Sequence, residues 1–204
     1  MPRPPALAAL VLGLTLTLSA CGSDGASTDT PVTVSDTEHN DADVAFATDM
    51  IQHHAQALAM VDLTIERDLD PEVTALAEDI RAAQGPEVEL MVDWLTDWDE
   101  PIPETVRDHA NAGHDDAETD HDGTGHGDEM PGMTSGEDMD ALENASDDEF
   151  QDMWLDMMIE HHEGAIEMAE TETGNGQYAP AVDLARDIVE AQSSEIQRME
   201  GLLS

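Results

Sequence analysis

The sequence predicts an all-α protein, a four-helix bundle made of two duplicated antiparallel helix hairpins. Residues 46–60 align without a gap on residues 154–168, with six of fifteen positions identical, and residues 76–95 align on residues 184–203 with nine of twenty identical. Apolar residues in these segments recur every three or four positions, the period of an amphipathic helix, and no alternating strand pattern competes. The constant offset means that each half is one supersecondary unit. Two such helical hairpins form a four-helix bundle with one long crossover connection.

The first hairpin is expected over residues 41–98, and its first helix should end near Asp68. Residues 70–72, Asp-Pro-Glu, give the second helix an N-cap, a proline at its first position and an acidic first turn. Gly85-Pro86 lies in the middle of this second helix, where a proline removes a backbone hydrogen bond. We therefore expect the helix to be kinked or divided at this point.

The second hairpin is expected over residues 147–204. Residues 146–149, Ser-Asp-Asp-Glu, match a capping box at the start of its first helix, which should run to about Thr173. The turn sequence Gly-Asn-Gly-Gln-Tyr then leads into a last helix from Pro180 to about Leu203.

The N-terminal segment, residues 1–20, is expected to be a secretory signal rather than part of the bundle. Its apolar run is too short to span a membrane and ends in small residues. Residues 18–21, Leu-Ser-Ala-Cys, resemble a bacterial lipobox, which would make Cys21 the lipid-carrying first residue of the mature chain. The alternative is an ordinary secretion signal with a free cysteine. Residues 21–40 are then a lipid-anchored flexible tether, and the protein is expected to be extracytoplasmic, lipid-anchored to the cell membrane.

The charge of the chain is strongly acidic, with 48 Asp and Glu residues against six Arg and no Lys. Such a surface repels nucleic acid phosphates, so no nucleic acid partner is expected, and it concentrates cations nearby. A solvated acidic coat explains most of these charges, and acidity alone identifies no metal. The oligomeric state stays open, a homo-oligomer included.

Residues 99–146 are expected to be a mostly disordered acidic linker, with a short helical turn around residues 103–110. The stretch 99–149 contains eighteen Asp or Glu, one Arg and no Phe, Tyr or Trp, so it buries too little apolar surface to offset its ordering entropy. Its His and Met residues are either loose, low-affinity metal ligands or incidental parts of a solvated spacer. These residues are His109, His114, His121, His126, Met130 and Met133.

Two histidine pairs occupy equivalent positions of the duplicated helices. At about 100° per residue, each pair lies on one stripe with methionine and a small alanine, which leaves room for both rings. A lone histidine on an apolar stripe is usually a core residue, but four histidines in duplicated pairs favour a metal site over a buried polar network. The stripes contain Met50, His53, His54, Ala57 and Val61 with Met60 at the edge, and Met158, His161, His162, Ala165 and Met168 with Met157 at the margin.

The partner helices carry matching polar residues on an otherwise apolar stripe. In a hairpin that turns near residue 69, residues 84–91 lie at the level of residues 46–54, so Gln84 and Glu87 are expected beside the first histidine pair. Buried polar groups need partners, since leaving one unpaired costs about 1–3 kcal/mol. The residues expected to support the metal ligands are Gln84, Glu87, Met91, Gln192, Glu195 and Met199. The Glu and Gln residues among them would orient the histidine rings or bind Cu(II) directly.

The donor types favour copper. Diiron and dimanganese carboxylate bundles need an inward Glu-x-x-His on two helices, and the only such motif, Glu118 to His121, lies in the predicted linker. Zinc could use the four histidines but would not need the methionines, whereas imidazole with thioether suits copper, Cu(I) preferring Met and Cu(II) preferring His. The sequence shows no nucleophile motif and no Gly-rich phosphate loop. Copper ion is therefore expected as bound cargo, and no enzyme activity is expected.

The pattern Met-x-x-His-His-x-x-Ala-x-x-Met, present at residues 50–60 and again at 158–168, resembles the motif of the family named domain of unknown function 305, which includes CopM-type periplasmic copper-binding proteins. The resemblance covers about residues 40–98 and 147–204. It implies a ferritin-like bundle, an extracytoplasmic location and binding of copper or silver. The ligands that it implies are Met50, His53, His54, Met60, Met158, His161, His162 and Met168.

The expected function is therefore extracytoplasmic copper binding and sequestration, in metal tolerance or homeostasis. Two alternatives stay open. One is a ferritin-like metal-dependent oxidoreductase. The other is a metal-free helical interaction module at the cell surface, whose histidine pairs only hold the bundle or a dimer together.

Overall fold

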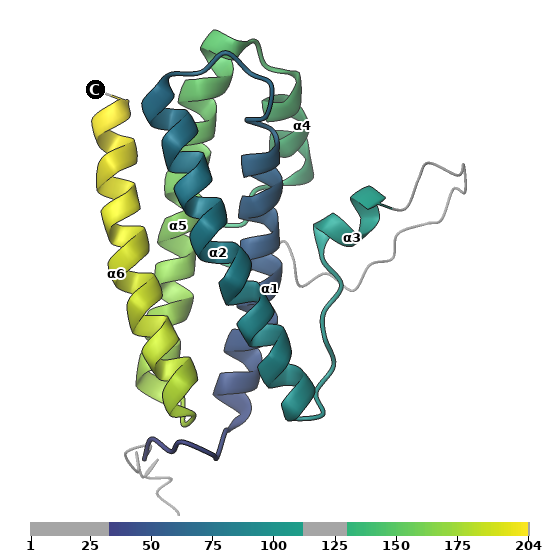
Figure 1. Cartoon of the computed structure of the whole chain (residues 1–204), viewed down its shortest axis with the longest axis vertical. Helices are drawn as coiled ribbons and strands as arrows, with labels where there is room; N and C mark the ends of the chain where they lie inside the picture. Colours follow the sequence, from purple (N-terminus) through teal and green to yellow (C-terminus); the bar gives the residue numbers. More distant parts are fainter. Residues whose placement is uncertain (1–32, 112–129, 204) are drawn as a thin grey trace, which may run out of the picture. The chain divides into compact units, whose positions relative to one another are not determined.

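The computed structural model describes residues 33–111 and 130–203. This part of the chain is helical, with one isolated backbone bridge between Ser35 and Tyr178. No helix in it is long and apolar enough to cross a bilayer. The predicted signal segment, Cys21 and most of the tether lie outside the described residues. The helices are α1 (Asp41–Asp62), α2 (Pro71–Asp97), α3 (Val106–Asn111), α4 (Gly136–Asn144), α5 (Asp147–Asn175) and α6 (Ala179–Leu202) (Figure 1).

The four long helices α1, α2, α5 and α6 form a bundle, which confirms the predicted fold class (Figure 1). Successive helices pair, α1 with α2 and α5 with α6, and the two hairpins meet mainly through α1 and α5. Two contacts show that α1 and α5 run antiparallel. Asp43, near the start of α1, accepts from the Gln177 N–H just after α5, while Trp154 Nε1, near the start of α5, donates to the Met60 carbonyl at 3.0 Å.

The start of α1 is held by a capping box. The Asn40 side chain accepts from the backbone N–H groups of Ala42 and Asp43, and the Asp43 carboxylate accepts from the Asn40 N–H at 2.6 Å. Asp43 also accepts from the backbone N–H groups of Gln177 and Tyr178. This fully buried carboxylate therefore joins the start of α1 to the turn between α5 and α6.

A second buried carboxyl group, that of Glu172, lies beside Asp43. Its side chain fills the space over Gly176, where a Cβ atom would overlap the carboxyl group. Burial raises the pKa of Glu172 to about 8, and the nearby carboxylate of Asp43 acts in the same direction. Glu172 is therefore mostly protonated at neutral pH, and the pair carries about one negative charge instead of two.

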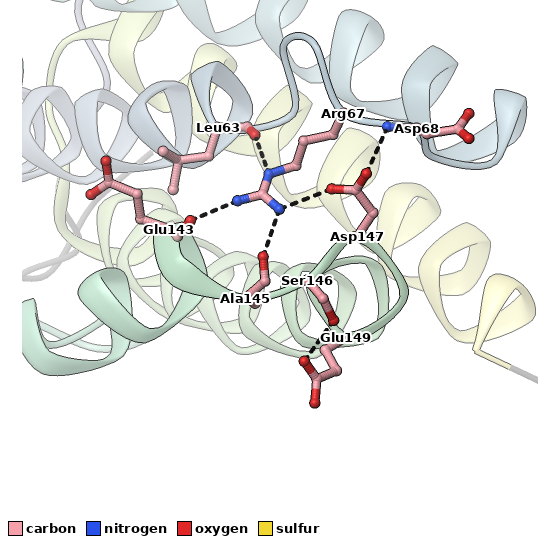
Figure 2. Close-up of polar contacts among 8 residues, drawn as sticks. All are labelled: Leu63, Arg67, Asp68, Glu143, Ala145, Ser146, Asp147 and Glu149. Carbon is pink, nitrogen blue, oxygen red and sulfur yellow. Dashed lines mark hydrogen bonds and ion pairs between the residues drawn. The ribbon is translucent and has the colours of Figure 1, made fainter.

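The connection between α1 and α2 is fastened by Arg67 (Figure 2). The guanidinium group lies 3.9 Å over the Phe150 ring. It donates to the Asp147 carboxylate and to three backbone carbonyl groups, those of Leu63, Glu143 and Ala145. One side chain thus ties the end of α1 to the junction between α4 and α5.

Two helix ends differ from their predicted form. α1 ends at Asp62 rather than near Asp68, because the chain turns through Glu66, whose φ of 68° is incompatible with a continuing α-helix. At the start of α5, the Ser146 side chain makes no bond to a backbone N–H group. Its hydroxyl donates to the Glu149 carboxylate at 2.6 Å instead, so the predicted capping box is wrong (Figure 2).

The sequence predicts a kink or a division of α2 at Pro86. The helix runs through Pro86 without a break, so a division is wrong. Packing explains the difference, because Gln84 before the proline and Met91 after it are both buried. These tertiary contacts offset the backbone hydrogen bond that the proline removes.

The prediction that residues 99–146 are mostly disordered is wrong for their last part. α4 begins at Ser135, whose side chain accepts from the Asp138 N–H, and Leu142 of α4 is fully buried in the core. α3 overlaps the helical turn expected around residues 103–110. The burial of one leucine side chain docks α4 on the core. The composition of the whole acidic segment does not indicate which single residue becomes buried.

The core consists of two apolar clusters with a polar layer between them. Cluster A lies toward the α1–α2 connection and includes Met60, Leu76, Phe150, Trp154 and Met158. Cluster B lies toward the α5–α6 turn and includes Phe46, Met50, Trp94, Ala165 and Ile188.

Candidate metal centre

Four histidines form the polar layer between the two clusters, called the histidine layer below. His53 and His54 of α1 and His161 and His162 of α5 are each 0% exposed. The first pair is flanked along α1 by residues of cluster B and then of cluster A, and the second pair is flanked along α5 in the opposite order. The antiparallel arrangement of α1 and α5 therefore brings the two duplicated pairs to the same level of the bundle.

His53 and His161 lie against each other in this layer, with ring centroids 3.7 Å apart and an angle of 41° between the ring planes. Burial lowers the pKa of His53 to about 3, with the nearby His54 as the second cause. Burial, followed by the charge of His53, lowers the pKa of His161 well below its ordinary value. Both rings are therefore neutral at physiological pH, the form in which histidine binds metal ions.

Each of the other two histidines is bonded to a glutamate of its own hairpin. His54 Nε2 lies 2.7 Å from Glu87 Oε2, and His162 Nε2 lies 2.8 Å from Glu195 Oε2. The two glutamate side chains are 19% and 17% exposed, so each reaches from the surface to the buried ring. The same separation of 33 residues in both pairs confirms the predicted register of each hairpin.

Three of the four rings are oriented through Nε2. His53 Nε2 donates to the Pro131 carbonyl oxygen at 3.0 Å, since a carbonyl oxygen can only accept. His54 and His162 face carboxylate oxygens through Nε2 in the same way. Nδ1 of all three rings is buried without a hydrogen-bond partner among the described residues. Metal-binding histidines show this arrangement, with one nitrogen donating to a carbonyl or carboxylate group and the other coordinating the ion.

His161 and two glutamines complete this set of unpartnered polar groups. Neither ring nitrogen of His161 has a hydrogen-bond partner in the described part of the chain, and neither does either polar side-chain atom of Gln84 or the Oε1 atom of Gln192. Gln84 and Gln192 are 2% and 3% exposed, which confirms their predicted inward position. Each such unpaired group costs about 1–3 kcal/mol, so the layer is chemically suited to a ligand that accepts lone pairs.

Methionines bracket the histidine layer on both sides. Each copy of the motif contributes one methionine to each apolar cluster, so the duplication places equivalent thioethers on opposite sides of the layer. Met168 is partly exposed, whereas the other seven predicted ligands are fully buried. Cluster A contributes Met60, Met158 and Met199, and cluster B contributes Met50, Met91 and Met168.

Within residues 33–111 and 130–203, no group of three or more His, Cys, Asp or Glu side chains is placed to hold one metal ion. The four histidines therefore do not form a zinc-type cluster here. The carboxylates of Glu87 and Glu195 are bonded to imidazole nitrogen in this layer. The layer offers imidazole nitrogen, with methionine thioethers in the apolar clusters on either side of it.

Residues 130–135 cover the histidine layer beside α1 and α5, a feature that the sequence-based prediction lacks. Residues 130–133, Met-Pro-Gly-Met, form a turn in which the Met133 N–H donates to the Met130 carbonyl at 3.3 Å, and Gly132 has a φ of 73°. Pro followed by Gly is the sequence signal for a β-turn whose third residue has a positive φ. The turn presents the Pro131 carbonyl to His53.

Two residues hold this segment. They occupy equivalent positions of the duplicated motif but differ in type. The Gln56 amide exchanges two hydrogen bonds of 2.8 Å with the backbone N–H and carbonyl of Thr134. The counterpart of Gln56 in α5 is Gly164, where a Cβ atom would overlap the Pro131 carbonyl group. The difference between the two copies of the motif therefore serves the docking of residues 130–135.

The predicted linker ligands are only partly described. Met130 and Met133 lie in the turn over the layer, and both are partly buried. His109 belongs to α3. The remaining three, His114, His121 and His126, lie outside the described residues.

The fold and the site define a class of protein, a four-helix bundle whose core is divided by a duplicated layer of histidines between methionines. The chain belongs to the DUF305 family, domain of unknown function, whose family model matches residues 43–203. This confirms the resemblance carried by the two copies of the motif. None of the curated proteins matches the chain.

Solved structures of this family are similar to the chain. A DUF305 protein from Streptomyces coelicolor is 33% identical, with a TM-score of 0.65, and the match covers 79% of this chain and 91% of that one. A DUF305 fragment from Deinococcus radiodurans is 30% identical, with a TM-score of 0.65, over 80% of this chain and 96% of that one. CopM in its Cu(II)-bound form is 27% identical, with a TM-score of 0.61, over 79% of this chain and 95% of CopM.

Proposed function

We propose that this protein binds copper, as Cu(I) or Cu(II), and Ag(I) in the histidine layer and sequesters the metal outside the cytoplasm. One observation carries the proposal. Three buried rings face a carbonyl or carboxylate oxygen through Nε2, and each has an Nδ1 without a hydrogen-bond partner among the described residues, in a layer between two groups of methionines. Such hydrogen bonds orient a histidine for coordination through its other nitrogen.

The proposed ligands are the side chains of the two motifs. Thioether sulfur suits Cu(I) and Ag(I), and imidazole nitrogen suits Cu(II), so a mixed layer serves both oxidation states of copper. Glu87 and Glu195 would orient the rings and bring negative charge close to the bound cation. Nitrogen would come from His53, His54, His161 and His162, and sulfur from Met50, Met60, Met158 and Met168.

The similarity to CopM supports this choice of ions. The similar CopM structures include Cu(I)-bound, Cu(II)-bound and Ag-bound forms. These are the ions that an imidazole and thioether donor set selects on chemical grounds.

Burial favours sequestration over catalysis. All four rings are fully buried, so an ion in the layer would present no open coordination face to a substrate. We propose that the protein lowers free copper at the cell surface and that a lipid on Cys21 holds it there. The Streptomyces relative, a presumed secreted protein, supports an extracytoplasmic location.

Thermal unfolding of residues 22–204, without metal and with Cu(I), Cu(II), Ag(I), Zn(II) or Fe(II), tests the proposal. A ligand that binds only the native state, at about a hundred times its Kd, adds about 2.7 kcal/mol of stability. We expect such stabilisation with the copper and silver ions. In the double variant His54→Gln with His162→Gln, the amide can still donate to the glutamate but Nδ1 is lost. The metal-induced shift should therefore disappear while the metal-free protein stays helical.

The matched control is His39→Gln, because His39 stacks on Trp98 with ring centroids 4.3 Å apart, outside the histidine layer. This variant should keep the full copper shift. No shift with any metal would refute the proposal and favour a metal-free interaction module. A shift with Fe(II) accompanied by turnover with oxygen would favour the oxidoreductase.

A further inference from the structure

A second group of thioethers lies outside the histidine layer. Met133, Met153 and Met157 line one cavity of about 450 Å³ between residues 130–135, α4 and α5, called the methionine groove below. None of the three belongs to the duplicated motif. All three are partly exposed, whereas Met158, the neighbour of Met157 in the chain, is fully buried in cluster A.

The backbone holds these three side chains on a common cavity. Met153 and Met157 are four residues apart on α5, so they lie one above the other on the same helix face. Met133 is the last residue of the turn that docks on α5, where Gly132 lies against the backbone at Glu160 and Gly164. The turn is held further by the bonds of Pro131 and Thr134 to α1. The groove is therefore built on fastened backbone from two separate segments.

The charge around the methionine groove suits a cation. The carboxylate residues Asp138 and Glu160 line the same cavity and are exposed, and no Arg is among the described residues that line it. A protein partner that docked in this groove through apolar side chains would bury these two carboxylates, and burying a carboxylate without a partner is costly. A small cation that binds sulfur leaves both carboxylates in water.

We propose that the methionine groove is a second soft-metal site, which binds one Cu(I) or Ag(I) ion through the thioethers of Met133, Met153 and Met157. Thioether ligands select Cu(I) and Ag(I) over hard or borderline divalent ions, and the two carboxylates raise the local cation concentration. This site goes beyond the proposed function, since it uses no residue of the histidine layer. Residues 130–135 separate the two sites, with Thr134 Oγ1 4.0 Å from Met60 Sδ on the inner side and Met133 in the groove on the outer side.

Methionine methyl NMR with Ag(I) on the full chain in detergent tests this site. Ag(I) is diamagnetic, so each ¹³C-labelled methyl group reports binding at its own sulfur. The variants Met133→Leu, Met153→Leu and Met157→Leu assign the three signals, since exchanges of similar volume are the best tolerated in packed regions. We expect the three signals to shift together over one equivalent of Ag(I), also in the variant His54→Gln with His162→Gln.

Native mass spectrometry gives the second readout. The triple leucine variant should bind one Ag(I) fewer than the wild-type chain, and the control Met139→Leu, on α4 outside the groove, should bind the wild-type number. If the three groove signals stay in place while those of Met50 and Met158 shift, the groove is not a site and the proposed function stands. If no methionine signal moves with Ag(I), both proposals are overturned.

Discussion

Replacing Gly164 by alanine should unseat residues 130–135 from the bundle. Gly164 lies within α5, where alanine is intrinsically favoured over glycine by about 0.5–1 kcal/mol. Its Cβ atom would, however, overlap the Pro131 carbonyl group and approach the Gly132 nitrogen to 2.6 Å. Both contacts are with backbone, which cannot rotate away as a flexible side chain could.

The expected cost follows from the bonds that the segment makes. Moving it breaks the bond between His53 and Pro131 at 3.0 Å and the two bonds between Gln56 and Thr134 at 2.8 Å. Each is worth about 0.5–1.5 kcal/mol net, so the loss of roughly 1.5–4.5 kcal/mol for the three bonds exceeds the helical gain. We expect Gly164→Ala to destabilise the metal-free protein by about 1–3 kcal/mol.

Urea unfolding followed by circular dichroism measures this difference, with Gly174→Ala as the control. Gly174 is also in α5 and has nothing within 4 Å of its Cβ position, so alanine there should be neutral or stabilising. Hydrogen exchange at residues 130–135 should rise in Gly164→Ala alone. Equal stabilisation by both substitutions would refute the docking of this segment on α5.

Two further predictions concern buried charge. The pKa of Glu172 is about 8 in the folded chain and near 4.5 in the unfolded chain. Between these pH values the folded chain therefore binds more protons than the unfolded chain. The free energy of unfolding should fall as pH rises from about 4.5 to 8, by at most about 1.4 kcal/mol per pH unit. Glu172→Gln should flatten this slope in unfolding curves measured at pH 5 to 8, and an unchanged slope would contradict the assignment. Arg67→Lys should cost about 1–3 kcal/mol in urea unfolding, because lysine cannot replace the fork of bonds in Figure 2. The control Arg186→Lys, in an exposed pair with Asp183, should change stability by less than about 0.5 kcal/mol, and similar effects of both would show that Arg67 is not structural.

The arrangement of the bundle could be predicted because its information is periodic and duplicated. A helix hairpin with a known turn position places residues at fixed levels, so spacing alone predicts Glu87 beside the first histidine pair, and the structure bonds it to His54. The second copy repeats the same pairing between His162 and Glu195. Two independent copies of one pattern make the inference robust against local irregularities such as Pro86.

The position of residues 130–135 over the histidine layer could not be predicted from composition, although local sequence signals were present. Residues 130–133 carry a Pro-Gly turn, and Ser135 is an N-cap for α4. These signals are short, and the acidic residues around them suggest a solvated chain. What docks residues 130–135 is a set of tertiary contacts with His53, Gln56 and Gly164, and the buried side chain of Leu142 docks α4 after them. These contacts depend on where α1 and α5 lie in space.

The predicted inward stripe of the partner helices differs between the two copies at its last position. Leu203 matches Leu95 in the duplication, yet it is exposed while Leu95 is fully buried. The reason is that α6 ends at Leu202, whereas α2 continues beyond Leu95 to Asp97. A sequence repeat specifies the type of side chain at a position. Burial of that side chain also requires that the helix continues past it and that neighbouring residues surround it.

The histidine layer also specifies how the helices align lengthwise. A slip of α5 along α1 by one turn, about 5.4 Å, would move His161 and His162 against one of the apolar clusters and separate them from His53. A purely apolar core tolerates such a slip far better, and a single buried polar position is enough to select one register in coiled coils. With four rings and two glutamate partners at one level, the bundle has one favoured alignment in the metal-free chain, so the proposed metal ligands are in register as soon as the protein folds.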